Sequence, residues 1–442
     1  MNTKKKTSVL KRLENKKIAL LGFGLDNQAL FALLEKHKIK TDITICDARP
    51  LNVLPSAQSA YSQISYRLGA EFNQRLYEFD ILFRAPGWPV ACPGVQEALK
   101  LGRTELTSPL NIFFSLCPSK NIIGVTGTKG KGTTASLIYR ILKNAKKRVW
   151  LGGNIGVAPL GFVDKIKASD YIVLELSSFQ LEDLKYSPRL AVITNLFKEH
   201  LAPADPHNPN FHSSYAAYWR AKLNIVNQPE NKYLVINETL SNKIKTYRRQ
   251  SKIITFGSSS LPSKLVGDFN RQNIAAAVAV AKILKIKPDD YKKTVAQFSN
   301  LEHRLELVKT IGGVSFFDNS FSTTPESTAL DLKSFSGPII LIAGGADKGA
   351  DFRPLAKIIK QRVKLIILLP GQATARLKKE VEAAGLTKKS IKMAADMEAA
   401  VKSAKTAAES GDIVLLSTAC ASFGIFKNYK ERGDLFKKYV RT

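Results

Sequence analysis

Residues 121–134 read Asn-Ile-Ile-Gly-Val-Thr-Gly-Thr-Lys-Gly-Lys-Gly-Thr-Thr. The apolar run 121–125 predicts a buried strand, and residues 135–143 have the apolar spacing of a helix. A glycine-rich turn between a strand and a helix presents successive backbone N–H groups to phosphate oxygens, and the helix N-terminus adds a positive dipole end. This order of strand, glycine turn and helix predicts an α/β domain that binds the phosphates of a nucleotide.

The same loop carries the side chains that phosphoryl transfer requires. Lys131 supplies a positive charge for the β- and γ-phosphates, and Thr133 or Thr134 supplies a hydroxyl ligand for Mg²⁺. Gly132 follows the lysine directly, so the spacing is not that of a strict Walker sequence. We therefore predict that ATP is bound by Gly127, Thr128, Lys129, Gly130, Lys131, Gly132, Thr133 and Thr134.

A second nucleotide-binding pattern precedes this loop. A strand is predicted at 17–21, followed by Gly22-Phe23-Gly24, a helix at 27–36, and a strand at 42–46 that ends in Asp47. This order is typical of a Rossmann-like unit. The third glycine position of that pattern holds Asn27, so a purely structural tight turn remains an alternative.

A third α/β segment begins near residue 300. Strands predicted at 337–343, 363–369 and 413–417 alternate with helices, which favours a mainly parallel sheet. We expect three domains with boundaries at 1–115, 116–299 and 300–442. The predicted fold class is α/β, with a Rossmann-like N-terminal domain, a central P-loop-type ATPase domain and a Rossmann-like C-terminal domain.

Composition restricts the cellular setting. The four cysteines, Cys46, Cys92, Cys117 and Cys420, are far apart, which disfavours a zinc ribbon or a disulfide framework and favours a reducing cytoplasm. No apolar run reaches the roughly 18 residues that a membrane helix needs. The basic start lacks the apolar stretch of a secretory signal. We expect a cytoplasmic protein without membrane insertion.

The formal net charge of +30 has two explanations. Clustered lysines and arginines bind nucleic acid by neutralising phosphates. Alternatively, dispersed lysines cover solvated helix faces and help to attract small anionic substrates. Because no basic repeat interleaved with aromatic residues is present, we favour the second explanation and expect no nucleic-acid partner.

Further stretches follow the glycine loop in a fixed order, at 152–156, 175–181, 221–223, 303–304, 344–348, 419–422 and 426–429. Together with the loop they resemble the Mur ligases, over nearly the whole chain. The stretch Glu-Leu-Ser-Ser-Phe-Gln-Leu at 175–181 is similar to the segment typical of the D-glutamate-adding member of that family.

The resemblance implies an activity in peptidoglycan synthesis. The expected reaction is ATP-dependent addition of D-glutamate to UDP-N-acetylmuramoyl-L-alanine, with release of ADP and phosphate. A carboxylate is a poor electrophile, so ATP first converts it to an acyl phosphate, from which an amine displaces phosphate. The implied cofactors are ATP and Mg²⁺, and we expect a monomer whose active site lies where the three domains meet.

The resemblance also implies the catalytic residues, which are Lys131, Glu175, His200 and Lys222. The implied metal ligands are Thr133, Glu175, His200 and a carbamylated Lys222. Carbamylation would turn the ammonium of Lys222 into an anion able to hold Mg²⁺. From the residues alone, alternative interpretations stay open. Glu175 could be a charge at a helix N-terminus, His200 a structural histidine, and Lys222 an exposed helix lysine.

The remaining implied contacts fall into three groups. For ATP they are Asn270, Asn273, Arg304 and Asp318; for D-glutamate they are Thr323, Lys348, Ser422, Phe423 and Tyr429; for the nucleotide sugar they are Leu25, Asp26, Asp47, Arg49, Gly69 and Asn154.

The sequence departs from the family pattern at several positions. Phe269 replaces a histidine, Phe321 replaces a lysine, and the order Asp318-Asn319 reverses the usual amide and acid. A Pro/Asn-rich insertion also occupies 202–210.

Two alternatives remain. A folylpolyglutamate synthase-like ligase is disfavoured by the Rossmann-like segment of roughly 115 residues before the loop. A non-catalytic, basic nucleic-acid-binding relative is disfavoured because Lys131, Glu175, His200 and Lys222 are all retained.

Overall fold

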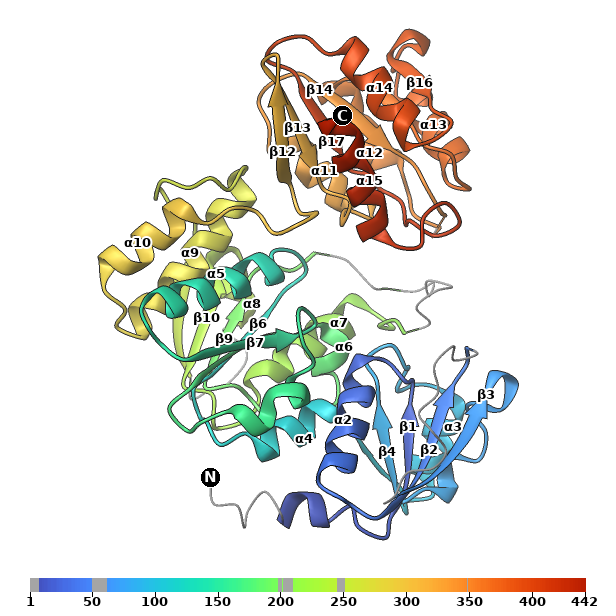
Figure 1. The fold of residues 1–442 in the computed structure, drawn as a ribbon, viewed down its shortest axis with the longest axis vertical. Helices are drawn as coiled ribbons and strands as arrows, with labels where there is room; N and C mark the ends of the chain where they lie inside the picture. The colour runs from blue at the N-terminus through green and yellow to red at the C-terminus, as the bar shows by residue number, and fades with distance from the viewer. Residues whose placement is uncertain (1–7, 50–61, 198–200, 202–209, 245–250, 348) are drawn as a thin grey trace. The chain divides into compact units, whose positions relative to one another are not determined.

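The computed structural model describes residues 8–49, 62–197, 201, 210–244, 251–347 and 349–442. By compactness the chain divides into two units, Met1–Ser259 with Gln272–Thr294, and Ser260–Arg271 with Val295–Thr442. Two sheets belong to the first unit and one to the second (Figure 1). The sheets are mainly parallel and alternate with helices, which confirms the predicted α/β class.

The first sheet has the strand order β3-β2-β1-β4-β5, and every neighbouring pair is parallel. Its elements are β1 (Lys17–Leu21), α2 (Leu25–Lys36), β2 (Thr41–Asp47), β3 (Ser62–Leu68), β4 (Ile81–Arg84), α3 (Pro93–Lys100) and β5 (Glu105–Thr107). Ile18 and Leu20 pack in one cluster with Leu30 of α2, whereas Leu21 packs in another with Val95 of α3. A strand covered on both faces needs apolar residues at successive positions. The strand order 3-2-1-4-5 is that of a Rossmann fold without its sixth strand.

The second sheet has the order β11-β10-β9-β6-β8-β7 and is parallel throughout. Its strands are β6 (Ile122–Thr126), β7 (Val149–Gly153), β8 (Tyr171–Glu175), β9 (Leu190–Ile193), β10 (Tyr233–Asn237) and β11 (Lys252–Phe256). Val125 of β6 pairs with Glu175 of β8 on one side and with Val192 of β9 on the other. The loops that leave these three strands therefore start next to one another, at the edge where α/β folds bind ligands.

Helices of the second sheet are α5 (Lys131–Asn144), α6 (Ser178–Leu181), α7 (Tyr215–Leu223), α8 (Ser241–Ile244), α9 (Asp268–Ile283) and α10 (Pro288–Gln297). The short helix α4 (Pro109–Leu116) follows β5 and packs against the second sheet's helical segment Pro159–Lys165. There the rings of Phe113 and Phe162 meet edge to face, with centroids 6.0 Å apart. One hydrophobic cluster thus continues from the first sheet into the second.

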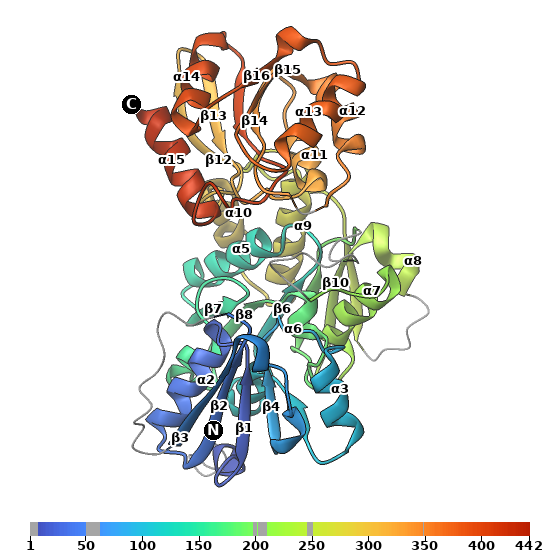
Figure 2. The same cartoon turned by 90° about the vertical axis from the view of Figure 1, so that its right-hand side faces the viewer.

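The third sheet has the order β12-β13-β17-β14-β15-β16 and is parallel except for the pair β12–β13. Its strands are β12 (Glu306–Ile311), β13 (Val314–Asp318), β14 (Ile339–Ala343), β15 (Val363–Leu368), β16 (Ile391–Met393) and β17 (Ile413–Leu416). Its helices are α11 (Pro325–Lys333), α12 (Arg353–Arg362), α13 (Thr374–Ala383), α14 (Met397–Ala407) and α15 (Tyr429–Arg441). Leu341 packs towards α11–α13, and Ile342 packs towards α14 and α15, on opposite faces of the sheet (Figure 2).

The predicted elements correspond closely to the observed ones. The strand expected at 17–21 is β1, and those expected at 337–343, 363–369 and 413–417 are β14, β15 and β17. The helix expected at 135–143 lies within α5, which begins four residues earlier at Lys131. The observed helix starts directly at the glycine turn.

All four cysteines have free thiols, as their spacing predicted. In the described part of the chain, no helix combines the length and the hydropathy that a membrane span requires.

Candidate active site

The glycine loop connects β6 to α5 and turns tightly at Gly130. Gly130 has a φ of 79°, in the left-handed region, and caps the N-terminus of α5. A Cβ atom at this position would lie 2.1 Å from Oδ1 of Asn273, so a larger residue would have to displace that side chain and would be strained at this positive φ. Because a helix N-terminus offers N–H groups and a positive dipole end to an anion, this turn has the geometry of a phosphate-binding loop.

The loop is held by the residues that follow β9. Oδ1 of Asn195 accepts a hydrogen bond from the backbone N–H of Lys129 at 2.8 Å, and Nδ2 of Asn195 donates to the carbonyl oxygen of Lys129 at 2.9 Å. The hydroxyl of Thr194 donates to the same carbonyl oxygen at 2.7 Å. These bonds fix the backbone of the loop before any ligand binds, which lowers the ordering cost of binding.

Lys131, the residue expected to contact the reacting phosphates, is the first residue of α5 and is half-buried. Its Nζ donates to the carbonyl oxygen of Thr128 at 2.8 Å, so the ammonium group lies over the loop. The hydroxyl of Thr134 donates to Oδ1 of Asn273 at 3.3 Å. Within the described residues no such side-chain bond is seen for Thr133, which makes Thr133 the more available hydroxyl for a metal ion.

Glu175 is the last residue of β8 and is buried. Its Oε1 accepts a hydrogen bond from Nδ2 of Asn154 at 3.0 Å. Its Oε2 is buried and, among the described residues, has no hydrogen-bond partner. A buried carboxylate oxygen without a partner is costly, and a bound cation would satisfy it. Because Mg²⁺ prefers carboxylate oxygens, the residues present fit an Mg²⁺ site at Glu175.

Lys222 of α7 is 1% exposed, which rules out the alternative that this residue is an ordinary exposed lysine on a helix. Its Nζ donates to the carbonyl oxygen of Gly127 at 2.7 Å and lies 4.6 Å from the centre of the Tyr218 ring. The hydroxyl of Tyr218 in turn lies 2.9 Å from Oγ1 of Thr128. Helix α7 is therefore joined to the glycine loop by two adjacent polar contacts, and Lys222 belongs to the same site as Gly127.

The stretch 175–181 is anchored to the first sheet by Arg84, the last residue of β4. Arg84 is buried and donates to the carbonyl oxygens of Trp88 at 2.9 Å and Phe179 at 2.6 Å. It also donates to a carboxylate oxygen of Asp183 at 3.1 Å. Sequence reasoning missed Arg84, and its position at the end of an apolar strand was the one available signal.

His212 is a second residue that sequence reasoning missed. It is buried, its Nε2 lies 2.9 Å from Oγ of Ser178, and its ring stacks on Phe179 with centroids 4.9 Å apart. Its backbone forms a β-bridge with Leu201, the residue after His200. Its position ten residues before Lys222, in a chain with five histidines, was a usable signal.

Two of the residues predicted to bind the nucleotide sugar, Asp47 and Arg49, lie at the carboxyl end of β2. Oδ2 of Asp47 accepts a hydrogen bond from the backbone N–H of Phe23 at 3.0 Å, and Oδ1 accepts from the backbone and from Nε of Arg49, each at 3.0 Å. Burial acts to raise the pKa of Asp47, but the bonds from Arg49 and Phe23 outweigh it, so the pKa is lowered. The result is a fixed carboxylate beside an exposed arginine.

Other predicted residues of the first sheet lie at the start of α2 and after β3. Leu25 is exposed at 71%, and Oδ2 of Asp26 accepts a bond from Nε2 of Gln180 at 3.4 Å. Burial raises the pKa of Asp26. Gly69 has a φ of 62°. Asn27 is fully buried, and its amide donates to the carbonyl oxygen of Gly22 at 2.8 Å, so it stabilises the turn.

In the second unit, the stretches predicted to bind ATP and D-glutamate meet at the carboxyl ends of β13, β17 and β14. Ala346 and Ala421 form an antiparallel bridge. The hydroxyl of Thr418 donates to the carbonyl oxygen of Ser322 at 3.1 Å. The structure therefore brings together residues 318–323, 344–347 and 419–422, which are far apart in the sequence.

The reversed pair Asp318-Asn319 has distinct partners. Oδ2 of Asp318 lies 2.7 Å from Nδ1 of His303, whereas Nδ2 of Asn319 donates to a carboxylate oxygen of Asp331 at 2.7 Å. Asp318 is thus the member of the pair that contacts the stretch 303–304, and Asn319 binds α11.

The aromatic replacement at Phe321 forms a small cluster. The guanidinium carbon of Arg304 lies 3.7 Å from the centre of the Phe321 ring, and the Tyr429 ring meets Phe321 edge to face at 5.1 Å. Phe321 therefore holds Arg304 by a cation–π contact.

The other predicted residues of this unit have ordinary positions. Nδ2 of Asn270 donates to the carbonyl oxygen of Val266 at 2.8 Å, Ser422 is buried, and Thr323 and Phe423 are half-buried. His200 and Lys348 lie outside the described residues.

Two acidic groupings around His303 in the described residues have metal-like spacing, one with Glu302 and Asp434 and the other with Glu306 and Asp318. Nζ of Lys437 lies 2.6 Å from Glu302, 3.3 Å from Asp434 and 3.6 Å from Glu306. Because a buried lysine already pairs with three of these four carboxylates and His303 contacts the fourth, Asp318, we interpret the groupings as an ion-pair network.

The chain is similar to known ligases over nearly its whole length. The chain matches the Mur ligase middle domain over residues 125–261 and the Mur ligase glutamate ligase domain over 303–420. It is 36% identical to a UDP-N-acetylmuramoylalanine--D-glutamate ligase of Acetivibrio thermocellus, covering 100% of this chain and 99% of that protein. The chain belongs to the Mur ligase family. A ligase of the same name from Ruminiclostridium cellulolyticum is 34% identical, with 98% of each chain covered.

Solved Mur ligases share the fold. The UDP-N-acetylmuramate-alanine ligase of Thermotoga maritima aligns with a TM-score of 0.57 and 15% identity, over 97% of this chain and 99% of that one. The MurF ligase of the same organism aligns with a TM-score of 0.57 and 16% identity, over 98% and 96%. A folylpolyglutamate synthase of Yersinia pestis aligns with a TM-score of 0.54 and 14% identity, over 74% of this Mur ligase and 91% of that chain. At these identities the likeness extends to the fold alone.

Proposed function

We propose that this chain catalyses the ATP-dependent addition of D-glutamate to UDP-N-acetylmuramoyl-L-alanine, a step of peptidoglycan synthesis. The observation that carries the proposal is its full-length similarity to curated ligases of that name. The phosphate-binding geometry of the glycine loop and the buried positions of Glu175 and Lys222 support it. We also propose three domains with boundaries at 115 and 299, a monomeric state and a cytoplasmic location.

The first chemical step is transfer of the γ-phosphoryl group of ATP to the alanyl carboxylate. Phosphoryl transfer depends chiefly on positioning and charge neutralisation. The backbone of residues 127–132 would bind the phosphates, and Lys131 would place its charge on their oxygens. Thr133, Glu175, Lys222 and His200 would hold Mg²⁺, which when bound neutralises phosphate charge. The products of this step are ADP and an acyl phosphate.

Carbamylation of Lys222 fits the contacts of this residue. Addition of CO₂ to the neutral amine gives a carbamate and releases one proton. The carbamate nitrogen keeps one N–H, which could still donate to the carbonyl oxygen of Gly127 as Nζ does at 2.7 Å. The new carboxylate would place a negative charge next to the phosphate loop, where an ammonium group would repel a metal ion.

The second step is attack of the D-glutamate amine on the acyl phosphate. The amine forms the amide bond, the bond from the acyl carbon to the phosphate oxygen breaks, and a proton leaves the nitrogen. In our proposal Thr323, Lys348, Ser422, Phe423 and Tyr429 bind D-glutamate, while Asn270, Asn273, Arg304 and Asp318 bind the rest of ATP. Leu25, Asp26, Asp47, Arg49, Gly69 and Asn154 would bind the nucleotide sugar.

An isotope experiment tests the acyl phosphate. UDP-N-acetylmuramoyl-L-alanine with ¹⁸O in its alanyl carboxylate is turned over with ATP and D-glutamate, and the released phosphate is analysed by mass spectrometry. We expect one ¹⁸O atom in each phosphate, because an oxygen of the carboxylate becomes the bridging oxygen. Release of unlabelled phosphate together with amide product would contradict this route.

A further inference from the structure

A large cavity lies away from the candidate active site, at the opposite ends of the strands. It has a volume of about 1160 Å³ and is lined by residues of both sheets of the first unit. Lys16 precedes β1, Lys120 precedes β6 and Lys232 precedes β10, so the cavity lies at the amino ends of these strands. The glycine loop and Glu175 lie at the carboxyl ends. The cavity is therefore separate from the site described above.

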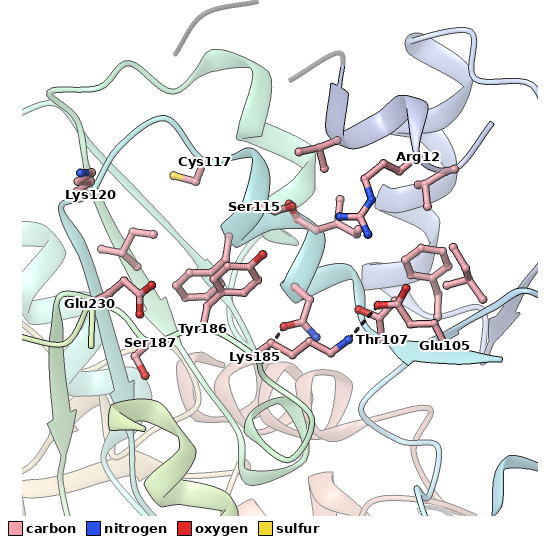
Figure 3. A pocket seen from close by; sticks show the side chains of 18 of the residues that line it. Arg12, Glu105, Thr107, Ser115, Cys117, Lys120, Lys185, Tyr186, Ser187 and Glu230 are labelled. Atoms are coloured by element: carbon pink, nitrogen blue, oxygen red, sulfur yellow. Dashed lines mark hydrogen bonds and ion pairs between the residues drawn. The ribbon is translucent and has the colours of Figure 1, made fainter. Parts of the chain in front are cut away.

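The middle of the cavity has an aromatic wall. The rings of Phe114 in α4 and Tyr186 after α6 are stacked, with centroids 5.8 Å apart and planes 4° from parallel. Figure 3 shows Tyr186 at the centre of the cavity, with Arg12 to one side and Lys120 to the other. Both rings are half-buried, and within the described residues the Tyr186 hydroxyl makes no hydrogen bond. A flat apolar surface of this kind suits another planar ring.

The rim of the cavity is strongly basic. Seven basic and three acidic residues line it. Two of the acids are already paired, Glu105 with Lys185 at 2.9 Å and Asp80 with Lys16 at 3.8 Å. In the described part of the chain no ion pair links a carboxylate to Arg12, Arg103, Lys120 or Lys232, and all four side chains are exposed. Several cations around a concave surface attract an anion.

We propose that this cavity is a second ligand site, for a nucleotide whose base stacks on the Phe114–Tyr186 wall and whose phosphates bind the surrounding basic residues. The volume is sufficient, because small-molecule sites span about 300–1000 Å³. An uncharged ligand would leave the basic rim unused, and a non-planar anion would leave the aromatic wall unused. The site takes residues from both sheets, so a bound nucleotide would link them.

The test measures binding of the fluorescent nucleotide mant-GDP to the full chain by fluorescence anisotropy. We expect saturable binding that unlabelled GDP displaces better than guanosine or inorganic diphosphate alone, because base and phosphates both contribute. Arg12→Glu and Tyr186→Ala should each weaken binding by at least about tenfold, the scale of one lost charged hydrogen bond or stacking contact. Neither residue belongs to the proposed catalytic machinery.

Two variants distinguish this cavity from the glycine loop. Lys11→Glu makes the same kind of charge change as Arg12→Glu, at an exposed residue that does not line the cavity, and should leave binding unchanged. Lys131→Ala weakens the loop and should also leave binding unchanged. Thermal melting checks that each variant is folded. Loss of binding in Lys131→Ala with retention in Arg12→Glu and Tyr186→Ala would overturn the proposal, and so would the absence of saturable binding.

Discussion

Nζ of Lys222 donates a hydrogen bond of 2.7 Å to the carbonyl oxygen of Gly127, 95 residues earlier in the chain. Gly127 follows β6 and has a φ of 145°; a Cβ there would lie 2.0 Å from the hydroxyl oxygen of Thr194. The contact joins a buried helix lysine to the loop that carries Lys131. A chemical change at Lys222 would therefore act directly on the glycine loop.

Lys222→Ala should leave the enzyme nearly inactive. If the carbamate is the active form, its loss removes a negative ligand beside Mg²⁺; two unit charges 4 Å apart interact by about 4 kcal/mol at an effective dielectric of 20. Added formate or acetate should restore part of the activity. Activity of the wild type should fall at low pH, where a carbamate decomposes. Steady-state phosphate release measures each effect.

Arg220→Ala is the matched control, because Arg220 is an exposed cation on the same helix. It should keep near wild-type activity. Circular dichroism checks the folding of both variants. Full activity of Lys222→Ala would refute the proposed role of this residue.

Lys131→Ala should lower kcat by roughly 10²–10³-fold, the cost of losing one preorganised contact to a charged transition state. The fold should persist, because the Lys131 side chain is only half-buried and lies outside the hydrophobic cluster that joins the two sheets. Lys143→Ala removes an exposed lysine from the same helix and should have no effect. Phosphate release at saturating substrates is the measurement. A rate for Lys131→Ala equal to that of Lys143→Ala would show that this loop does not bind the reacting phosphates.

Arg84→Met should destabilise the first unit by about 3–5 kcal/mol, the usual cost of removing one partner of a buried ion pair. The carboxylate of Asp183 and the carbonyl oxygens of Trp88 and Phe179 would lose their donor. Urea unfolding, monitored by fluorescence, measures this change in the free energy of unfolding. Arg140→Met, at an exposed position of α5, should change the midpoint little. Equal midpoints for the two variants would mean that Arg84 does not anchor stretch 175–181.

The pair Asp47–Arg49 predicts a pH-dependent stability. Because hydrogen bonds lower the pKa of Asp47 in the folded state, its carboxylate stabilises the fold above the ordinary aspartate pKa. That contribution is lost as the pH falls through the lowered pKa. Arg49→Ala should therefore be less stable than the wild type at neutral pH, and the difference should vanish in acid. In an Asp47→Asn background, the loss of stability caused by Arg49→Ala should not depend on pH. If it still does, the pH dependence belongs to a titrating group other than Asp47.

Sequence patterns predicted the framework well because its signals are local. Residues 18–21 and 171–174 are continuous apolar runs, which a parallel sheet covered on both faces requires. The glycine turn at 127–132 could also be predicted locally. Residue 130 has a backbone conformation in the left-handed region, which favours glycine.

The partners of polar side chains could not be predicted in the same way. The lysine at 222 lies on a helix with little amphipathic pattern, and its burial depends on the tertiary contact with Gly127. In the sequence, Asn27 stands where the Rossmann pattern has its third glycine, which suggests a departure from the pattern. In the structure its amide donates to the carbonyl oxygen of Gly22 and stabilises the turn after β1. Arg84 and His212 contact stretch 175–181 from positions 95 and 34 residues away, through pairs that no local pattern marks.

The most direct test of the proposed function is phosphate release by the purified full chain with ATP and Mg²⁺ across a matrix of acceptors and amino acids. The acceptors are UDP-N-acetylmuramoyl-L-alanine, UDP-N-acetylmuramate and a pteroate; the amino acids are D-glutamate, L-glutamate and L-alanine. We predict release only when UDP-N-acetylmuramoyl-L-alanine and D-glutamate are both present. Turnover of the pteroate with L-glutamate at an equal or higher rate would contradict the account and favour a folate ligase.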